Sequence, residues 1–319
     1  MSKPLISIVT PCYNESDNIE ELYRRVIEAI QPLEKKYEFE IIVIDNHSTD
    51  DTVEKLRKMT AIDQRLKVII NTRNFGHIRS PYYGILQSRG VATVYLASDL
   101  QDPPELIAEF IRPWEMGFKL VMAVKPYSQG NPIVHSVRRM CYRGFEKISG
   151  MPIIRDSTGF GLYDKVVLDQ LRQINDPYPF LRGLIAELGY PVKTIEFNQP
   201  RRLRGITKNN FYTLYDIAWL GLVGHSKLPI RMAALIGIIM GVLSVASAFI
   251  LVILKLLFWK FIPIGIAPLA IGMFFLFGMQ FIFISIIGEY IGAILTYVQQ
   301  RPIVVESERI NFDDKIGEA

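Results

Sequence analysis

The sequence is poor in the residues that mark disulfide-rich, metal-cluster and nucleic-acid-binding proteins. Its 319 residues include only two cysteines, Cys12 and Cys141, whose separation fits no metal-binding motif. Two isolated thiols are typical of reduced, buried cysteines in a cytosolic domain. The formal net charge is only +4, so the basic excess expected of a nucleic-acid-binding domain is missing. The N-terminus runs directly into a strand pattern, and we therefore expect no cleavable signal peptide.

Charged residues are also absent from two long apolar runs, Met232–Leu254 and Phe261–Ile287. At about 1.5 Å per residue, helices of this length cross a hydrocarbon layer of roughly 30 Å. We therefore expect two transmembrane helices, at residues 230–257 and 261–288. Basic residues around the runs favour a cytoplasmic N-terminal domain and a multi-pass protein of the inner or plasma membrane. The small-residue element Gly237–Gly241 either joins helices of two subunits in a homo-oligomer or is a chance occurrence.

Before the apolar runs, strand patterns alternate with helix patterns. The predicted strands lie at residues 5–10, 40–44, 67–71, 91–97 and 119–125, with helices at 16–30, 52–59, 80–88 and 104–114. This alternation predicts an α/β domain with a mostly parallel sheet that is covered by helices on both faces. Ligands of such sheets bind beyond the carboxyl ends of the strands.

Composition and pattern assign the remaining segments. A basic helix is expected at 134–149, a glycine-rich turn at 156–163, a helix at 179–188 and a strand at 192–197. The chain is thus divided into a domain at 1–210, an amphipathic juxtamembrane helix in 211–229, two spans in 230–298 and a cytoplasmic tail at 299–319.

Three polar segments follow predicted strands, at the edge where a ligand is expected. They are Thr10-Pro11-Cys12-Tyr13-Asn14-Glu15, Asp45-Asn46-His47-Ser48 and Asp99-Leu100-Gln101-Asp102-Pro103-Pro104. Their order and spacing resemble the family-2 glycosyltransferases of GT-A fold, in particular the branch that acts on polyprenyl phosphates and includes relatives of dolichol-phosphate mannose synthase. The resemblance covers residues 5–210, and the two apolar runs match the bactoprenol glucosyltransferases of that branch.

The resemblance implies where a nucleotide-sugar donor binds. The implied donor contacts are Pro11, Tyr13, Glu15, Ile44, Asp45, Asn46, Ser98, Asp99, Lys125, Arg202 and Lys208. In the family that the chain resembles, the second strand usually ends Asp-Asp-Gly-Ser, and its second aspartate, which contacts the base, is replaced here by Asn46. Because an amide both donates and accepts hydrogen bonds, a base contact is kept while the choice of base stays open. Arg202 and Lys208 either steady the departing diphosphate or form a juxtamembrane patch that attracts anionic lipids.

The resemblance also implies a bound Mg²⁺ or Mn²⁺, with Asp99 and Gln101 as its protein ligands. The usual Asp-x-Asp element would place a further carboxylate where this chain has Ala97. Diphosphate and water oxygens can complete the shell of a hard cation that has few protein ligands. Asp102 is another candidate ligand, but an aspartate before two prolines is a favourable helix N-cap, and we predict that role for it.

Catalysis is implied to depend on Asp99 and Asp156, the latter at the position of a proposed general base. A lipid phosphate is already anionic near neutral pH, so Asp156 either accepts a proton, orients the acceptor or only caps a turn. Arg138, Arg139 and Arg143 match positions that hold the acceptor phosphate, and guanidinium groups suit bidentate phosphate contacts. A solvated basic helix face is the alternative for these arginines.

Together these implications predict a metal-dependent, inverting transfer of a hexose to a polyprenyl phosphate of the undecaprenyl type. Glucose from UDP-glucose is the donor expected first, with GDP-mannose, UDP-GlcNAc and UDP-aminoarabinose as alternatives. The product would be a polyprenyl-monophosphate sugar for glycosylation of the cell envelope. A non-catalytic lipid-sugar translocator or nucleotide sensor is the alternative class, supported by Ala97. A processive polysaccharide synthase would need more spans and a Gln-x-x-Arg-Trp motif, which the sequence lacks.

Overall fold

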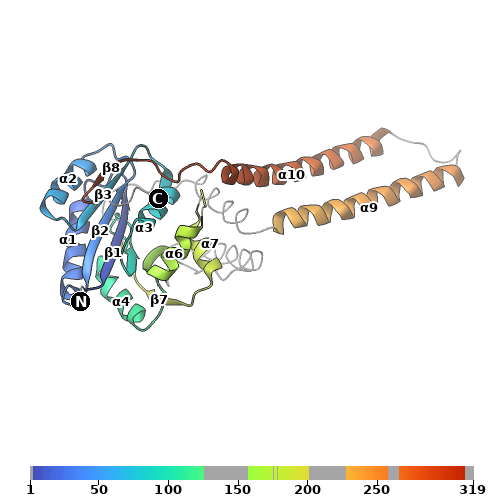
Figure 1. Cartoon of the computed structure of the whole chain (residues 1–319). Helices are drawn as coiled ribbons and strands as arrows, with labels where there is room; N and C mark the ends of the chain where they lie inside the picture. The colour runs from blue at the N-terminus through green and yellow to red at the C-terminus, as the bar shows by residue number, and fades with distance from the viewer. Residues whose placement is uncertain are drawn as a thin grey trace. The chain divides into compact units, whose positions relative to one another are not determined.

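The computed structural model describes residues 3–125, 157–174, 176–177, 179–200, 228–257 and 266–312. The chain forms two compact units. The first unit contains the N-terminal part of the chain together with the C-terminal segment from Gln300, and the second contains two long helices (Figure 1).

One eight-stranded sheet organises the first unit, in the order β7-β5-β6-β4-β1-β2-β3-β8. The strands are β1 Leu5–Cys12, β2 Glu38–Asp45, β3 Leu66–Asn71, β4 Ala92–Tyr95, β5 Leu120–Val124, β6 Ser157–Asp164, β7 Val192–Glu196 and β8 Glu306–Ile310. Strands β4, β1, β2 and β3 are parallel, β5 and β7 are parallel to each other, and β6 and β8 are antiparallel to their neighbours. The predicted α/β fold with a mostly parallel sheet is confirmed.

Successive residues of a strand point to opposite faces of the sheet, so apolar residues in a row give the sheet two apolar faces. Helices cover both of these faces. The helices are α1 Ile19–Ile30, α2 Thr52–Ile62, α3 Gly76–Leu86, α4 Ile107–Glu115, α6 Lys165–Gln173 and α7 Leu181–Leu188, with short 3₁₀ turns η1 Gln31–Leu33 and η2 Pro104–Leu106. Ile8 of β1 lies in the core beside α1 and α4, whereas the next residue, Val9, lies in the core beside α3, α6 and α7. Such strands are buried on both faces, which explains their continuous apolar runs.

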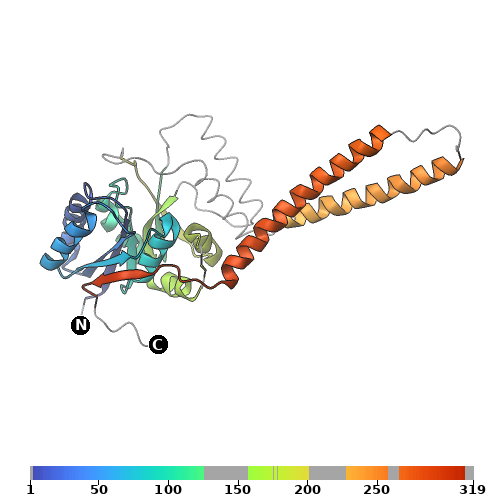
Figure 2. The ribbon, with the colours of Figure 1, turned by 90° about the horizontal axis from the view of Figure 1, so that it is seen from above.

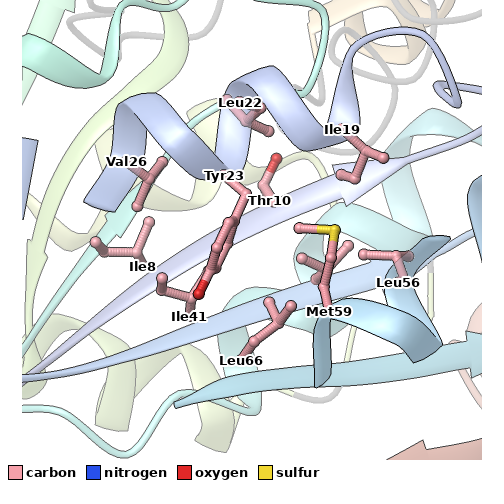
Figure 3. A pocket seen from close by; sticks show the side chains of 11 residues that line it. Ile8, Thr10, Ile19, Leu22, Tyr23, Val26, Ile41, Leu56, Met59 and Leu66 are labelled. Carbon is pink, nitrogen blue, oxygen red and sulfur yellow. The ribbon is translucent and has the colours of Figure 1, made fainter. Parts of the chain in front are cut away.

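A small apolar cavity lies between α1, α2 and the sheet (Figure 3). Its volume is about 10 Å³, so it has room for at most one water molecule. Thr10 lines it, and the Thr10 Oγ1 atom is buried without a hydrogen-bond partner among the described residues. The cavity is far too small for a nucleotide, and it belongs to the core rather than to a ligand site.

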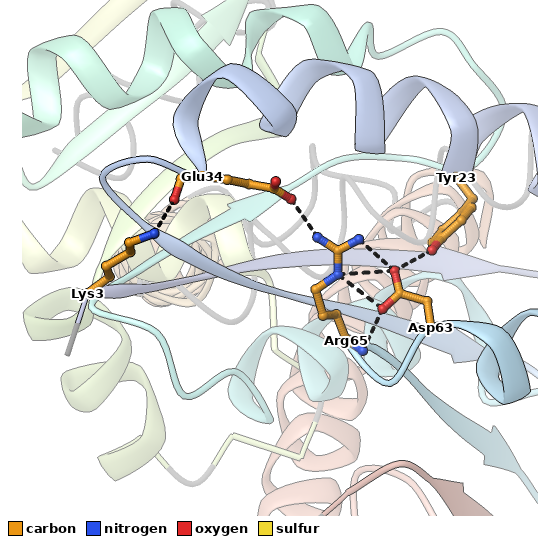
Figure 4. A network of polar contacts seen from close by, with 5 residues as sticks. All are labelled: Lys3, Tyr23, Glu34, Asp63 and Arg65. Carbon is orange, nitrogen blue, oxygen red and sulfur yellow. Dashed lines mark hydrogen bonds and ion pairs between the residues drawn. The ribbon is translucent and has the colours of Figure 1, made fainter.

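An ion-pair network joins the end of α2 to the turn after α1 (Figure 4). Arg65 contacts Asp63 at 2.8 Å and Glu34 at 2.6 Å, and the Tyr23 hydroxyl donates to Asp63 at 2.6 Å. Lys3 adds a hydrogen bond to the Glu34 carbonyl oxygen at 2.7 Å. Burial acts to raise the pKa of Asp63, but the hydrogen bonds from Arg65 and Tyr23 outweigh it and lower this pKa to about 2.

Of the glycine-rich turn predicted at 156–163, residues 157–163 belong instead to strand β6, so the prediction was wrong for them. Glycines weaken a strand pattern in sequence. In the sheet, however, Gly161 lets β5 approach closely, because a Cβ atom there would lie 2.3 Å from the Val121 carbonyl oxygen. The close approach of two backbones therefore accounts for the glycine.

The segment expected as a cytoplasmic C-terminal tail takes part in the sheet. Strand β8 pairs antiparallel with β3 and covers what would otherwise be an exposed sheet edge (Figure 2). Glu308 pairs with Arg57, and the Asn311 amide donates to the carbonyl oxygens of Thr60 and Leu66, both at 2.9 Å. The C-terminal segment is therefore part of the first unit.

The second unit contains α9 Leu228–Leu257 and α10 Ile266–Val298. Helix α10 ends ten residues beyond the predicted end at 288, because the single charge of Glu289 does not interrupt it. Among the described residues, the stretch Phe275–Val298 is long and apolar enough to cross a membrane. Its large apolar side chains are mostly exposed, as expected of a surface that contacts lipid.

Gly237, the first glycine of the small-residue element in α9, faces α10 of the same chain. A Cβ atom added at Gly237 would lie 3.6 Å from Cε2 of Phe283 in α10. Close packing within the hairpin is therefore one use of this glycine.

Candidate functional site

The three polar segments identified from sequence lie at one edge of the sheet. Strands β1 and β2 are in register with Cys12 opposite Asp45, and Val9 of β1 is opposite Tyr95 of β4. Because these strands are parallel, the loops that follow them leave the sheet at the same carboxyl edge. The structure thus brings together the segments that the sequence analysis singled out.

Hydrogen bonds tie the loop after β1 to the loop after β2. The Asn14 backbone N–H donates to Ser48 Oγ at 2.8 Å, and the Thr49 N–H donates to Asn14 Oδ1 at 2.8 Å. The Glu15 N–H donates to Thr52 Oγ1 at 3.0 Å. Asn14 has a φ of 54°, a left-handed conformation that asparagine adopts more readily than most residues.

The predicted donor residues of the first loop remain partly accessible. Pro11, Tyr13 and Glu15 are half-buried, whereas Ser98 in the loop after β4 is buried. The Glu15 carboxylate accepts a hydrogen bond from Asn18 Nδ2 at 2.6 Å, which fixes its orientation at the start of α1. Ile44 is fully buried in the core, so any contact that it makes with a nucleotide is through its backbone.

Asp45 is fully buried and points into the protein. Its carboxylate accepts hydrogen bonds from the Ser48 backbone N–H at 2.8 Å, from the Ser48 hydroxyl and from the Cys12 thiol at 3.5 Å. Burial, reinforced by the charge of Asp45, raises the pKa of the Cys12 thiol well above its usual value. Cys12 is therefore a buried, protonated thiol, as expected, while Cys141 lies outside the described residues.

Asn46 is also turned inward and is only 6% exposed. Its side-chain amide holds the segment between β3 and α3, with hydrogen bonds to Asn71, Asn74, Phe75 and Gly76. The structure therefore shows this predicted base contact engaged with the protein itself.

The loop after β4 folds back on itself. Leu100 has a φ of 60°, and the Gln101 N–H donates to Asp99 Oδ1 at 3.1 Å. Asp102 Oδ2 accepts the Ala97 N–H at 3.0 Å. The predicted N-cap role of Asp102 is wrong, because η2 has no side-chain cap. The turn at Leu100 directs the carboxylate to Ala97.

Charge is concentrated around this loop. Burial of Asp102 and the nearby negative charge of Asp99 raise the pKa of the Asp102 carboxyl to about 6. The hydrogen bond from the Ala97 N–H and the positive charge of Lys125 act in the opposite direction and lower this pKa. Lys125, predicted to contact the nucleotide, therefore acts on the same loop as Asp99. Asp99 and Gln101, whose side chains carry oxygen donors, are both half-buried in this loop.

The donor set fits a hard divalent cation only if other ligands complete the shell. In the described part of the chain, no group of three or more histidine, cysteine or carboxylate side chains is placed so that it could hold a metal ion. Asp99 supplies a carboxylate and Gln101 an amide oxygen, both of which suit Mg²⁺ or Mn²⁺. The remaining ligands would come from diphosphate and water oxygens.

Arg182 of α7 was not identified from sequence. Its Nη1 donates to the Ser157 carbonyl oxygen at 3.1 Å. Burial and the charges of Asp102 and Asp99 raise the pKa of Tyr95, whereas the charge of Arg182 lowers it, so these three charged groups all act on Tyr95. In sequence Arg182 is an ordinary polar position on an amphipathic helix, which gives no signal of this placement.

Several predicted site residues lie outside the described residues. They are Arg138, Arg139, Arg143, Asp156, Arg202 and Lys208. Ser157, the residue after Asp156, is opposite Val124, the last residue of β5, which Lys125 follows in the chain.

Comparison with known proteins identifies the family. The profile of glycosyl transferase family 2 matches residues 7–171. An uncharacterised glycosyltransferase of Synechocystis sp. is 33% identical over 304 residues, which cover 95% of each chain. The bactoprenol glucosyl transferase of Shigella phage SfII is 31% identical over 311 residues, covering 96% of this chain and 99% of the phage protein.

Among solved structures, glucosyl-3-phosphoglycerate synthase from Mycobacterium tuberculosis with bound UDP is similar at a TM-score of 0.45 and 18% identity. The match covers 69% of this chain and 78% of that one. The family profile and the near full-length relatives carry the assignment: this chain belongs to glycosyl transferase family 2, with a GT-A catalytic domain.

Proposed function

We propose that this glycosyltransferase transfers a hexose from a nucleotide-sugar donor to a polyprenyl phosphate, with UDP-glucose as the first donor to test. The observation that carries the proposal is the 31% identity to a bactoprenol glucosyl transferase over 96% of the chain, which includes the C-terminal helices. The charged loop around Asp99, at the same sheet edge as the loop after β1, supports it.

The proposed reaction is a single in-line displacement with inversion at the anomeric carbon. An oxygen of the lipid phosphate attacks this carbon while its bond to the diphosphate breaks, and the nucleoside diphosphate leaves with the bonding electron pair. Arg138, Arg139 and Arg143 bind the acceptor phosphate, and Asp156 orients it or takes a proton. The product is a polyprenyl-monophosphate sugar for the cell envelope.

The donor side depends on the loops at the carboxyl edge of the sheet. The residues proposed to contact the donor are Pro11, Tyr13, Glu15, Ser98, Asp99, Lys125, Arg202 and Lys208. The cations of Arg202 and Lys208 stabilise the charge that develops on the departing diphosphate. Asp99 and Gln101 would hold Mg²⁺ or Mn²⁺, which would supply further charge neutralisation at the diphosphate.

A membrane location fits an acceptor that lives in the bilayer. We propose that α9 and α10 both span the inner or plasma membrane and that the catalytic domain is cytoplasmic. The apolar stretch Phe275–Val298 supports the second span, and the uncharged run Met232–Leu254 supports the first. A homo-oligomer formed through these helices is part of the same proposal.

The test is transfer by the purified full-length protein in detergent. With Mg²⁺, polyprenyl phosphate and labelled UDP-glucose, we expect a lipid-linked sugar whose formation is abolished by a chelator. Asp99→Ala and Asp156→Ala should each reduce turnover at least about a hundredfold. GDP-mannose, UDP-GlcNAc and UDP-aminoarabinose serve as alternative donors.

The same assay separates the enzyme from its non-catalytic alternative. Ala97 is the observation that favours a translocator or sensor, because it removes a usual metal-binding carboxylate. An active wild type excludes a purely binding role. If no donor in the panel gives a lipid-linked sugar, the proposed function is wrong.

A further inference from the structure

The side chain of Asn46 is the centre of a polar network that joins β2 to the loop after β3. Asn46 Oδ1 accepts hydrogen bonds from the Phe75 backbone N–H at 2.9 Å and from Asn71 Nδ2 at 3.1 Å. Asn46 Nδ2 donates to Asn74 Oδ1 at 2.9 Å and to the Gly76 carbonyl oxygen at 3.2 Å. All four partners belong to residues 71–76, from the last residue of β3 to the first residue of α3. We call this stretch the β3–α3 loop.

The orientation of this amide is fixed by its backbone partners. A backbone N–H can only donate and a carbonyl oxygen can only accept, so Oδ1 must face Phe75 and Nδ2 must face Gly76. A primary amide has two N–H donors and an oxygen with two lone pairs. All of these are in use, and a hydrogen bond to a nucleotide base would require one of them to be broken.

The network extends along the β3–α3 loop beyond Asn46. Asn74 Oδ1 also accepts the Gly76 N–H at 2.8 Å, and Asn71 Nδ2 also donates to Ser80 Oγ in the first turns of α3 at 3.1 Å. On the outer side of the loop, the exposed Arg73 guanidinium lies 4.1 Å from the centre of the Phe75 ring. The loop is thus held from inside while its outer side chains remain accessible.

The position of the loop places it at the edge of the candidate site. Ile70 at the end of β3 is opposite Asp45 at the end of β2, so the loop leaves the sheet beside the Asp45-Asn46 segment. We propose that Asn46 is a positioning residue that shapes the β3–α3 loop as a wall of the donor site, rather than a residue that binds the base. This inference rests on the proposed donor site.

The chemistry of residue 46 supports this role. An aspartate there would keep both acceptor bonds but would turn a carboxylate oxygen towards Asn74 Oδ1 and the Gly76 carbonyl oxygen. Two acceptors in contact repel each other and leave a buried group unsatisfied. The amide, with its two donors and two acceptor sites, therefore matches the partners that the loop of this chain presents.

The first test measures hydrogen exchange of the loop in the full-length protein. Asn46→Asp should speed exchange in peptides that cover residues 71–76 by about tenfold or more, because loss of one hydrogen bond changes a local opening equilibrium by that order. Asn74→Ala removes the shared partner at an exposed position and should have the same effect without changing the buried site. Asn311→Asp is the matched control, because that amide also donates twice but lies near the opposite end of β3.

The second test compares the dissociation constants of UDP and GDP. Both Asn46→Asp and Asn74→Ala should raise the dissociation constants of UDP and GDP by about tenfold each. The ratio of the two dissociation constants should change less than about twofold. Because the two residues act through one network, the double variant should bind each nucleotide about as tightly as the single variant of lower affinity.

The inference is overturned if Asn46→Asp leaves hydrogen exchange of the loop unchanged. It is also overturned if Asn46→Asp shifts the ratio of the UDP and GDP dissociation constants by about tenfold or more while Asn74→Ala leaves this ratio and both constants unchanged. Exchange and nucleotide binding need no sugar transfer. A wild type that makes no lipid-linked sugar would contradict the proposed function, and exchange would still decide the role of Asn46.

Discussion

Thr10 and Thr60 are both buried threonines, and they differ in whether the hydroxyl is satisfied. Thr60 Oγ1 donates to the Arg57 carbonyl oxygen at 2.9 Å, whereas Thr10 Oγ1 has no partner among the described residues. A buried hydroxyl without a partner lowers the stability of the fold. We expect Thr10→Val to be neutral or to stabilise the protein by up to about 1 kcal/mol, because valine has the same shape and no polar atom.

Thermal unfolding of the full-length protein in detergent measures this effect. Thr60→Val is the control, and it should lower the unfolding midpoint because it removes a satisfied hydrogen bond. Equal losses for the two substitutions would show that the Thr10 hydroxyl has a partner, such as a single water in the small cavity.

At the scale of an element, β6 depends on two glycines with different surroundings. A Cβ atom at Gly161 would lie 2.3 Å from the Val121 carbonyl oxygen, whereas at Gly159 the nearest atom would be 3.7 Å away. Gly159 has a φ of 98°, so Gly159→Ala carries backbone strain of roughly 1–2 kcal/mol without a clash. Gly161→Ala must also separate β5 from β6, and we expect a larger loss of stability.

The measurement is the unfolding midpoint of both variants together with their UDP binding. Gly161→Ala should lower the midpoint more than Gly159→Ala and should also weaken UDP binding, because β5 ends at Val124, next to Lys125 of the proposed donor site. The argument from the close approach of β5 and β6 fails if the two variants are equally stable.

Which elements can be predicted from sequence depends on where their stability originates. Buried strands such as β1 and amphipathic helices such as α1 have apolar patterns of their own, and they were predicted correctly. Strand β8 has the polar sequence Glu306–Ile310, and it is a strand because the edge of β3 is available to pair with it. The position of the polar loops followed from strand order, whereas the partners of Asn46 depend on tertiary contacts that no local pattern encodes. The partner of Asp102, the Ala97 N–H, is local in sequence but depends on the left-handed turn at Leu100, which the sequence pattern does not indicate.

At the scale of the whole molecule, carboxylates with lowered pKa values tie stability to pH. Asp63 joins α2 to β3 and contacts Tyr23 of α1, and its pKa of about 2 lies below the ordinary value of 3.8. A group with a lowered native-state pKa stabilises the fold above its unfolded-state pKa, and this contribution is lost as the pH falls through the native-state pKa. The contribution of Asp63 is therefore complete above about pH 4 and lost progressively towards pH 2.

Asp63→Asn should remove this pH-dependent contribution. The difference in unfolding midpoint between wild type and variant should be largest above about pH 4 and should shrink as the pH approaches 2, because protonated Asp63 no longer attracts Arg65. Tyr23→Phe removes one of the hydrogen bonds that lower this pKa and should give an intermediate profile. A difference that stays constant over this range would mean that Asp63 contributes by packing alone, and the network in Figure 4 would then not be a source of acid sensitivity.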